Sequence, residues 1–234
     1  MAAKASRAYD AELRSKRLSW PSEERISARN VKYFMVIAMS KIIGLTGGIA
    51  TGKSAVSQYL AAKQIPIIDA DKVAHQVQQP GQAGLAAIVR AFGKAVLTSD
   101  GSLDRERLGQ LVFGHPERLN QLVSVMDPYI RETILNQLAR YHDHKLVVID
   151  APTLFENGYT YLAAEIMVVY CDPVTQMKRL MKRNHLTIAQ AAARMKSQWP
   201  LQTKCDLADT IIYNSGSLAH TNEQIDKWLE NEME

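Results

Sequence analysis

The chain has 234 residues, of which 47% are hydrophobic and 22% are charged. This composition is that of an ordinary globular protein, and it excludes a disordered, collagen-like or coiled-coil chain. The formal net charge is +4, but residues 1–40 carry eight basic and four acidic side chains, so the other 194 residues carry 20 of each. A body without net charge offers no general attraction for nucleic acid or membranes, so anions must bind at local clusters.

Residues 1–40 are predicted to be an N-terminal extension. Charges scattered through the first 30 residues leave no apolar core for a signal peptide, and the apolar stretch 31–39 is too short to span a bilayer. Met35 and Met39 lie just before the first predicted strand. We therefore expect a dispensable extension or an over-long gene start.

The two cysteines, Cys171 and Cys205, lie far apart and outside any CxxC or Cys/His ligand spacing. The sequence therefore predicts neither a disulfide framework nor a zinc site. This pattern favours a reducing, cytoplasmic setting, and we expect a monomer that binds no nucleic acid and no membrane.

Five short apolar runs rich in β-branched residues predict strands that are buried on both faces. They cover residues 41–46, 65–69, 146–150, 166–171 and 210–214. Runs without polar alternation, separated by helical stretches, are typical of a parallel sheet between helices. The predicted fold is therefore an α/β, phosphate-loop NTPase-type five-stranded parallel sheet with helices on both faces.

The long connections between these strands predict additional helices. Pro116 suits a helix start and Pro128 is expected to break the run, so a second helix should begin near Ile130. A further helical stretch begins at Asp172-Pro173, and Thr187 with Gln190 has the spacing of a capping box. We expect a helical substrate-binding insertion and a helical lid.

The clearest motif is GGIATGKS, residues 47–54, which matches G-x-x-x-x-G-K-[ST] between a predicted strand and a predicted helix. Glycines let such a loop curl until its N–H groups point inward, and the next helix adds its positive N-terminal end. We expect ATP here, with Lys53 on the β and γ phosphates and the Ser54 hydroxyl on Mg²⁺. The other predicted contacts are Gly48, Ala50, Thr51, Gly52 and Ala55.

A switch-type GTPase is one alternative. Residues 203–206, TKCD, satisfy the base-reading pattern N/TKxD, but they follow a predicted helix instead of a strand. Asp150, which ends a predicted strand, is followed by Ala-Pro-Thr instead of x-x-Gly. We interpret the TKCD match as chance, because a short motif outside its structural context carries little weight.

A small-molecule kinase needs a carboxylate near the γ-phosphate and arginines that neutralise the transferred group. Asp69 and Asp71 follow the second predicted strand, at the same sheet edge as the phosphate loop, although one of them can also cap a helix. Arg179 and Arg183 share a helix face that could be a solvated basic surface. Over a phosphate loop, we interpret this pair as a lid that clamps ATP.

Further segments resemble the dephospho-CoA kinases, enzymes of coenzyme A biosynthesis. The resemblance covers residues 41 to about 230 and rests on separate blocks in the same order. These blocks are GLTGGIATGKS, IIDADKVAHQV with Pro80-Gly81, GSLDR with Phe113 and Pro116, Asp127-Pro128-x-Ile130-Arg131, Ala151-Pro152-x-Leu154-Phe155-Glu156, QMKRLMKR, and Ala208-Asp209-x-Ile211-x-Tyr213-Asn214.

The resemblance implies transfer of the ATP γ-phosphate to the ribose 3′-hydroxyl of dephospho-CoA, with Mg²⁺. It implies Asp71 as the catalytic base, assisted by Lys53 and Arg179, and it gives Arg179 and Arg183 to the ATP-clamping lid. Asn214 is implied near the adenine. The residues implied for the acceptor are Asp69, Asp71, Leu103, Asp104 and Arg105.

By the same resemblance, residues 41–234 form one kinase domain and residues 1–40 have no counterpart. The domain has three implied parts: a core (41–74, 142–175 and 201–234), a CoA-binding insertion (75–141) and a lid (176–200). The chain departs from the usual family pattern at Ala50-Thr51, Asp127 and Thr153. The last two departures concern the acceptor side.

Two other functions remain open from the residues alone. The first is a phosphate-loop kinase that acts on a nucleoside or nucleotide, because such enzymes share the loop, the acidic pair and the lid. The second is a regulatory module that binds ATP only as a conformational ligand. Transfer to dephospho-CoA, compared with transfer to nucleosides and their monophosphates, separates these functions.

Overall fold

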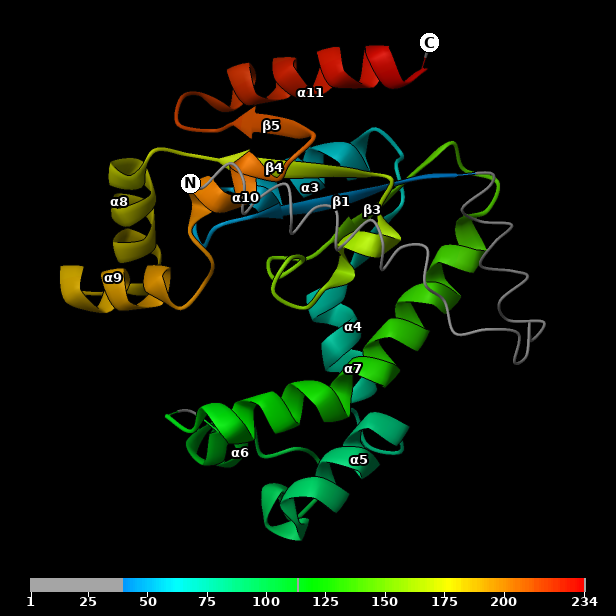
Figure 1. Ribbon diagram of the computed structural model, residues 1–234, viewed down its shortest axis with the longest axis vertical. Helices are drawn as coiled ribbons and strands as arrows, with labels where there is room; N and C mark the ends of the chain where they lie inside the picture. Colours follow the sequence, from blue (N-terminus) through cyan, green and yellow to red (C-terminus); the bar gives the residue numbers. More distant parts are fainter. Residues whose placement is uncertain (1–39, 113, 234) are drawn as a thin grey trace, which may run out of the picture.

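The computed structural model describes residues 40–112 and 114–233, so the expectations for residues 1–39 and for Phe113 lie outside the described residues (Figure 1). Five parallel strands form one sheet in the order β2-β3-β1-β4-β5. Their bounds are Lys41–Gly47 (β1), Ile67–Asp69 (β2), Leu146–Asp150 (β3), Glu165–Tyr170 (β4) and Thr210–Tyr213 (β5). All five predicted strands are confirmed, and so is the α/β fold.

Burial on both faces of the sheet explains why its strands lack polar alternation. In β3, Val147 and Ile149 belong to one core cluster while Val148 belongs to the other, because successive strand residues point to opposite faces. Helices α3 (Lys53–Ala62) and α11 (Leu218–Met233) cover the face of Val148. The opposite face is covered by α4 (Ala70–Val77), η3 (Tyr159–Leu162), α10 (Leu201–Asp206) and part of α7 (Pro116–Leu138).

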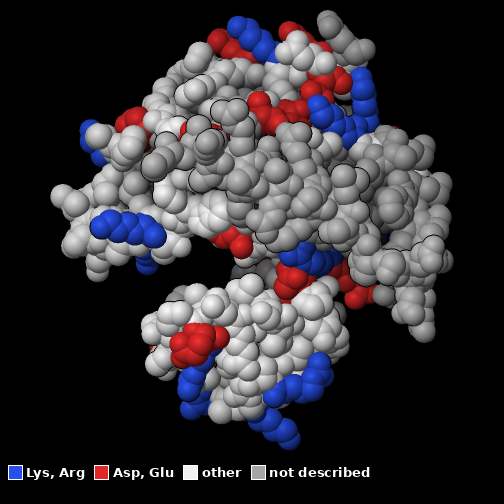
Figure 2. Space-filling model, viewed as in Figure 1, with Lys and Arg blue, Asp and Glu red and all other residues white. Residues whose placement is uncertain are grey.

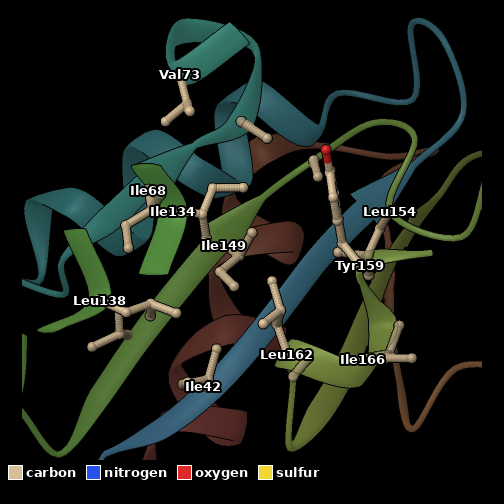
Figure 3. Close-up of a cluster of buried hydrophobic side chains, with 14 of the residues drawn as sticks. Ile42, Ile68, Val73, Ile134, Leu138, Ile149, Leu154, Tyr159, Leu162 and Ile166 are labelled. Atoms are coloured by element: carbon tan, nitrogen blue, oxygen red, sulfur yellow. The ribbon is translucent and has the colours of Figure 1, made fainter. Parts of the chain in front are cut away.

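The cluster on the α7 side joins the helical insertion to the sheet. Figure 3 shows Ile134 and Leu138 of α7 pointing at Ile42, Ile68 and Ile149 of the strands. Ile134 and Leu138 are both fully buried. The end of α7 is therefore fixed to the sheet, whereas its beginning projects away from it (Figure 1).

The rest of the insertion has a core of its own. This part of the insertion consists of α5 (Ala83–Phe92), η1 (Lys94–Val96), α6 (Arg105–Val112) and the first half of α7. A short helix, η2 (Ala139–Tyr141), follows the end of α7. The buried core residues of this part, together with the end of α4, are Val77, Ile88, Val96, Leu108, Val112 and Met126. Figure 2 shows a cleft between this helical insertion and the sheet. An insertion that binds the acceptor, as predicted, would face such a cleft.

Helix α7 runs without interruption from Pro116 to Leu138, so the predicted break at Pro128 is wrong. Proline removes one backbone N–H and bends a helix, and Figure 1 shows α7 bending midway. The helix continues because both halves are buried, at Met126 before the proline and at Ile134 after it. Neither α7 nor any other helix in the described part of the chain is long and apolar enough to cross a membrane.

Two helices after β4 make up the segment predicted to be the lid. Helix α8 (Pro173–Asn184) begins where the Asp172 carboxylate accepts a hydrogen bond from Thr175 N, and α9 (Ile188–Lys196) begins with the predicted Thr187–Gln190 capping box. Both predicted helix starts are confirmed. The TKCD segment lies within α10, before β5, so it lacks the position after a strand that a base-reading motif requires.

Truncating the fully buried Leu138 to alanine is expected to lower the free energy of unfolding by about 2–5 kcal/mol, because it leaves a cavity between α7 and the sheet. The matched control is Leu119→Ala on the same helix. Leu119 is 41% exposed, so its loss should cost only about 0.5 kcal/mol. Chemical denaturation of both variants checks this, and equal losses would contradict the packing described for α7.

Candidate functional site

The phosphate loop, residues 47–54, links β1 to α3 at the carboxyl edge of the sheet. Gly52 has φ of +93°, and a Cβ atom added there would lie 1.9 Å from Asn214 Nδ2, so only glycine fits. Gly52 is the N-cap of α3, where no side chain caps the helix. The first amides of α3 are therefore available to an anion, and the helix dipole favours negative charge at this end.

Side chains from several elements hold the loop carbonyls outward. The Gly48 carbonyl accepts hydrogen bonds from Thr51 N (3.2 Å) and Thr51 Oγ1 (2.9 Å). Ile49 O accepts from Gln176 Nε2 of α8 at 2.7 Å, and Thr51 O accepts from Asn214 Nδ2 at 2.8 Å. With these carbonyls held, the amides at the start of α3 can face an anion, whereas Thr51 N is already bonded within the loop.

Asn214 lies behind the phosphate loop, after β5. Its Nδ2 binds Thr51 O, while its Oδ1 accepts from Thr221 Oγ1 at 2.9 Å. The side chain is buried and both ends are hydrogen-bonded, so it supports the loop. Its predicted position near the adenine stays a prediction.

Lys53 forms an ion pair with Asp150, the last residue of β3. Asp150 lies opposite Leu45 of β1, so the strand register brings its carboxylate to the phosphate loop. Both side chains are largely buried. The sequence predictions did not include Asp150, although an acidic residue that ends the apolar run LVVID was a signal for it.

Asp69 and Asp71 have different surroundings. The Asp69 carboxylate caps α4 by accepting from Lys72 N at 3.0 Å. Asp71 lies in the first turn of α4 and makes no hydrogen bond of this kind. The helix-capping alternative therefore applies to Asp69, which leaves Asp71 available for chemistry.

The pKa of Asp71 is raised above its usual value, chiefly because surrounding protein partly desolvates the carboxylate. The positive charge of Lys53 opposes this rise in pKa, and the negative charges of Asp69 and Asp150 add to it. These influences bring Asp71 into the same electrostatic cluster as Lys53 and Asp150. Its side chain nevertheless remains open to solvent and to an acceptor.

The two lid arginines lie on α8, and only one of them reaches the phosphate loop in this state. Arg179 donates to Asn214 O at 2.8 Å and, more weakly, to Thr51 O at 3.5 Å. Arg183 is exposed, with a hydrogen bond to Asn184. The predicted contact of Arg183 with ATP stays a prediction.

A second lid contact reaches the loop from the end of α9. Ile49 N donates to Gln198 Oε1 at 2.8 Å, while Ile49 O is held by Gln176. Both glutamines were missed by the sequence reasoning, because neutral side chains carry no charge pattern that marks them.

The predicted acceptor residues lie in the insertion. Leu103 packs against the insertion core, and the Asp104 carboxylate accepts from Arg107 N at 2.9 Å at the start of α6. Arg105 is exposed. Leu103 and Asp104 thus have structural contacts, and acceptor binding by all three stays a prediction.

Asp127, a departure from the family pattern, pairs with Arg131 one turn later in α7. The Arg131 guanidinium also stacks over Tyr159 at 4.9 Å and Tyr161 at 5.2 Å, and it donates to Asn157 O at 3.0 Å. Burial raises the pKa of Tyr159 to about 12, which keeps this hydroxyl neutral. Asp127 therefore helps to join α7 to the segment after β3.

Comparisons with known proteins show the family of the chain. The family model described as dephospho-CoA kinase matches residues 41–220. Dephospho-CoA kinase of Enterococcus faecalis is 40% identical over 196 residues, covering 83% of this chain and 98% of its own. A crystal structure from Thermus thermophilus is 32% identical, with a TM-score of 0.74, over 83% of this chain and 98% of its own. Dephospho-CoA kinase from Campylobacter jejuni is 30% identical, with a TM-score of 0.64, over 82% and 97%.

Gly52→Ala is expected to weaken ATP binding about tenfold or more, because the new Cβ would displace Asn214 and distort the loop. Gly81→Ala is the matched control. Gly81 also has a positive φ, +83°, but a Cβ there meets nothing within 4 Å. Titration calorimetry with ATP checks both variants. Similar ATP affinities of the two variants would show that the close contact between Gly52 and the Asn214 side chain does not shape the site.

Proposed function

The chain belongs to the dephospho-CoA kinase family, and we propose that it transfers the ATP γ-phosphate to the ribose 3′-hydroxyl of dephospho-CoA, with Asp71 as catalytic base. Dephospho-CoA kinase activity and the use of ATP follow from the family. The roles of individual residues rest on the geometry of the site. The observation that carries them is Asp71 at the sheet edge, beside the Lys53–Asp150 pair.

ATP would bind with its phosphates in the loop concavity. Lys53 would leave Asp150 for the β and γ phosphates, a geometry that its flexible side chain permits. Amides at the start of α3, those of Lys53 and Ser54, would hold phosphate oxygens, while Ile49 N and Thr51 N keep their bonds to Gln198 and Gly48 O. Arg179, already bonded to the loop through Thr51 O, and Arg183 would then neutralise charge on the transferred group.

Mg²⁺ fits the oxygen donors at this edge of the sheet. The Ser54 hydroxyl is exposed in the first turn of α3, and the Asp150 carboxylate ends β3 nearby. Mg²⁺ in kinases is usually held by one or two protein oxygens together with phosphates and water, so these two side chains would be sufficient. When bound, Mg²⁺ supplies charge neutralisation for the phosphates.

Asp71 would accept the proton of the acceptor hydroxyl as that oxygen attacks the γ-phosphate. The raised pKa makes this carboxylate a better proton acceptor than an ordinary aspartate. Asp69, which caps α4, would hold the helix that carries the base. The raised pKa of Asp71 and its fixed helix together support Asp71 as the base at the reacting oxygen.

Dephospho-CoA would lie in the cleft between the insertion and the sheet, where Figure 2 shows an open face. Its candidate contacts are Asp69, Asp71, Leu103, Asp104 and Arg105. We propose that the enzyme is cytoplasmic and monomeric. The buried free thiols of Cys171 and Cys205 support the cytoplasmic setting. Sedimentation of the purified protein tests the monomer.

Asp71→Asn is expected to lower kcat by about 10² or more while ATP affinity stays within about threefold, because only the base is lost. Since the raised pKa means that folding disfavours the ionised carboxylate, the neutral asparagine should not lower the free energy of unfolding at pH 7. Asp69→Asn is the matched comparison for kcat at saturating dephospho-CoA, because asparagine also caps helices well and a lost acceptor contact at Asp69 would raise KM instead. Turnover lost in Asp69→Asn but kept in Asp71→Asn would reverse the two roles.

The raised pKa of Asp71 also predicts a pH profile. A base must be ionised, so kcat/KM for dephospho-CoA should fall as the pH drops through a pKa above the ordinary aspartate value of about 3.9. Initial rates at saturating ATP across the acidic range measure this limb. If kcat/KM falls only at or below the ordinary aspartate pKa, the desolvated environment of Asp71 is contradicted. If Asp71→Asn shows the same acidic fall in kcat/KM, the titrating group is another residue.

A further inference from the structure

Lys204 is a buried lysine that the proposed mechanism does not use. It lies on α10, and its side chain is 0% exposed. A lysine is almost never fully buried unless its amino group is paired, because removing the charge from water is costly. Its partners therefore show which parts of the molecule this charge connects.

The Lys204 amino group binds three oxygens from two segments of the site. Nζ lies 3.4 Å from Gly47 O, where the phosphate loop begins, and 2.9 Å from Pro152 O, two residues beyond Asp150. The third partner is Glu156 Oε1 at 2.8 Å. One cation thus links the start of the phosphate loop to the segment that carries the partner of Lys53.

Glu156 extends this contact to the lid. Its Oε1 also accepts from Trp199 N at 3.1 Å, at the end of the lid, and Phe155 stacks on the Trp199 ring with centroids 6.0 Å apart. The adjoining Gln198 binds Ile49 N of the phosphate loop. The lid end, the phosphate loop and the segment after β3 therefore converge on the Lys204–Glu156 pair.

We propose that Lys204, held by Glu156, is a positioning residue for ATP: it fixes the phosphate loop against the Asp150–Pro152 segment and the end of the lid. This inference rests on the assignment of ATP to residues 47–54. A fully buried ammonium and a largely buried carboxylate stand where apolar side chains would often stabilise a protein as well. Glu156 Oε2, moreover, is buried without a hydrogen-bond partner in the described structure, a cost that packing alone does not require.

The test separates positioning from folding with two variants. Lys204→Met leaves the largely buried Glu156 carboxylate without its cation, so it should lower stability as well as ATP affinity. The double variant Lys204→Met/Glu156→Gln removes both charges and keeps an acceptor for Trp199 N. It should regain thermal stability relative to Lys204→Met, yet remove the Lys204 donor that Gly47 O and Pro152 O share, so that Pro152 O keeps only its bond from Thr46 Oγ1 at 3.1 Å. Lys227→Met, on the exposed surface of α11, is the matched control.

ATP affinity is measured without acceptor, and KM values are then measured with dephospho-CoA. We expect the double variant to bind ATP about tenfold more weakly, with KM for dephospho-CoA within about threefold of the parent, and Lys227→Met to match the parent. ATP affinity within about twofold of the parent in a stable double variant would overturn the proposal. If that variant does not fold, Glu156→Gln decides: weakened ATP binding supports the proposal, and parental binding overturns it. A parent that binds ATP without transfer to dephospho-CoA would instead refute the proposed function.

Discussion

The geometry of the site depends on one constraint: the phosphate loop can turn its N–H groups toward an anion only if its carbonyls have partners on the outside. Buried backbone carbonyls without donors are costly. Here the donors come from separate elements, namely Gln176 on α8, Asn214 after β5 and Lys204 on α10. Because these donors come from the lid, from the end of a strand and from a core helix, the shape of the loop depends on contacts between segments far apart in the sequence.

The same arrangement explains how the site can be organised before ATP arrives. Lys53 is neutralised by Asp150, and the carboxylate of Asp71 lies in the field of both charges. In the proposed mechanism, phosphates would replace Asp150 as the partner of Lys53 and so change the balance of charge around Asp71. ATP binding would then be coupled to the pKa of the proposed base through a single lysine.

Sequence patterns predicted the parts of this site that depend on local chemistry. The strands follow from buried β-branched runs, and the phosphate loop follows from its glycines, Lys53 and Ser54. The pattern did not predict that α7 continues through Pro128, because burial on both sides of the proline is a tertiary effect. It also missed Asp150 and Lys204, whose roles depend on strand order and on contacts across the fold.

The most direct test of the account is an acceptor comparison with the purified full chain, Mg²⁺ and ATP labelled at the γ-phosphate. The candidate acceptors are dephospho-CoA, nucleosides and nucleoside monophosphates, and the labelled product is identified by mass and by the position of the new phosphate. We expect label on the ribose 3′-oxygen of dephospho-CoA and none on the other acceptors. Label on a nucleoside or nucleotide alone, or ATP binding without any transfer, would contradict the account.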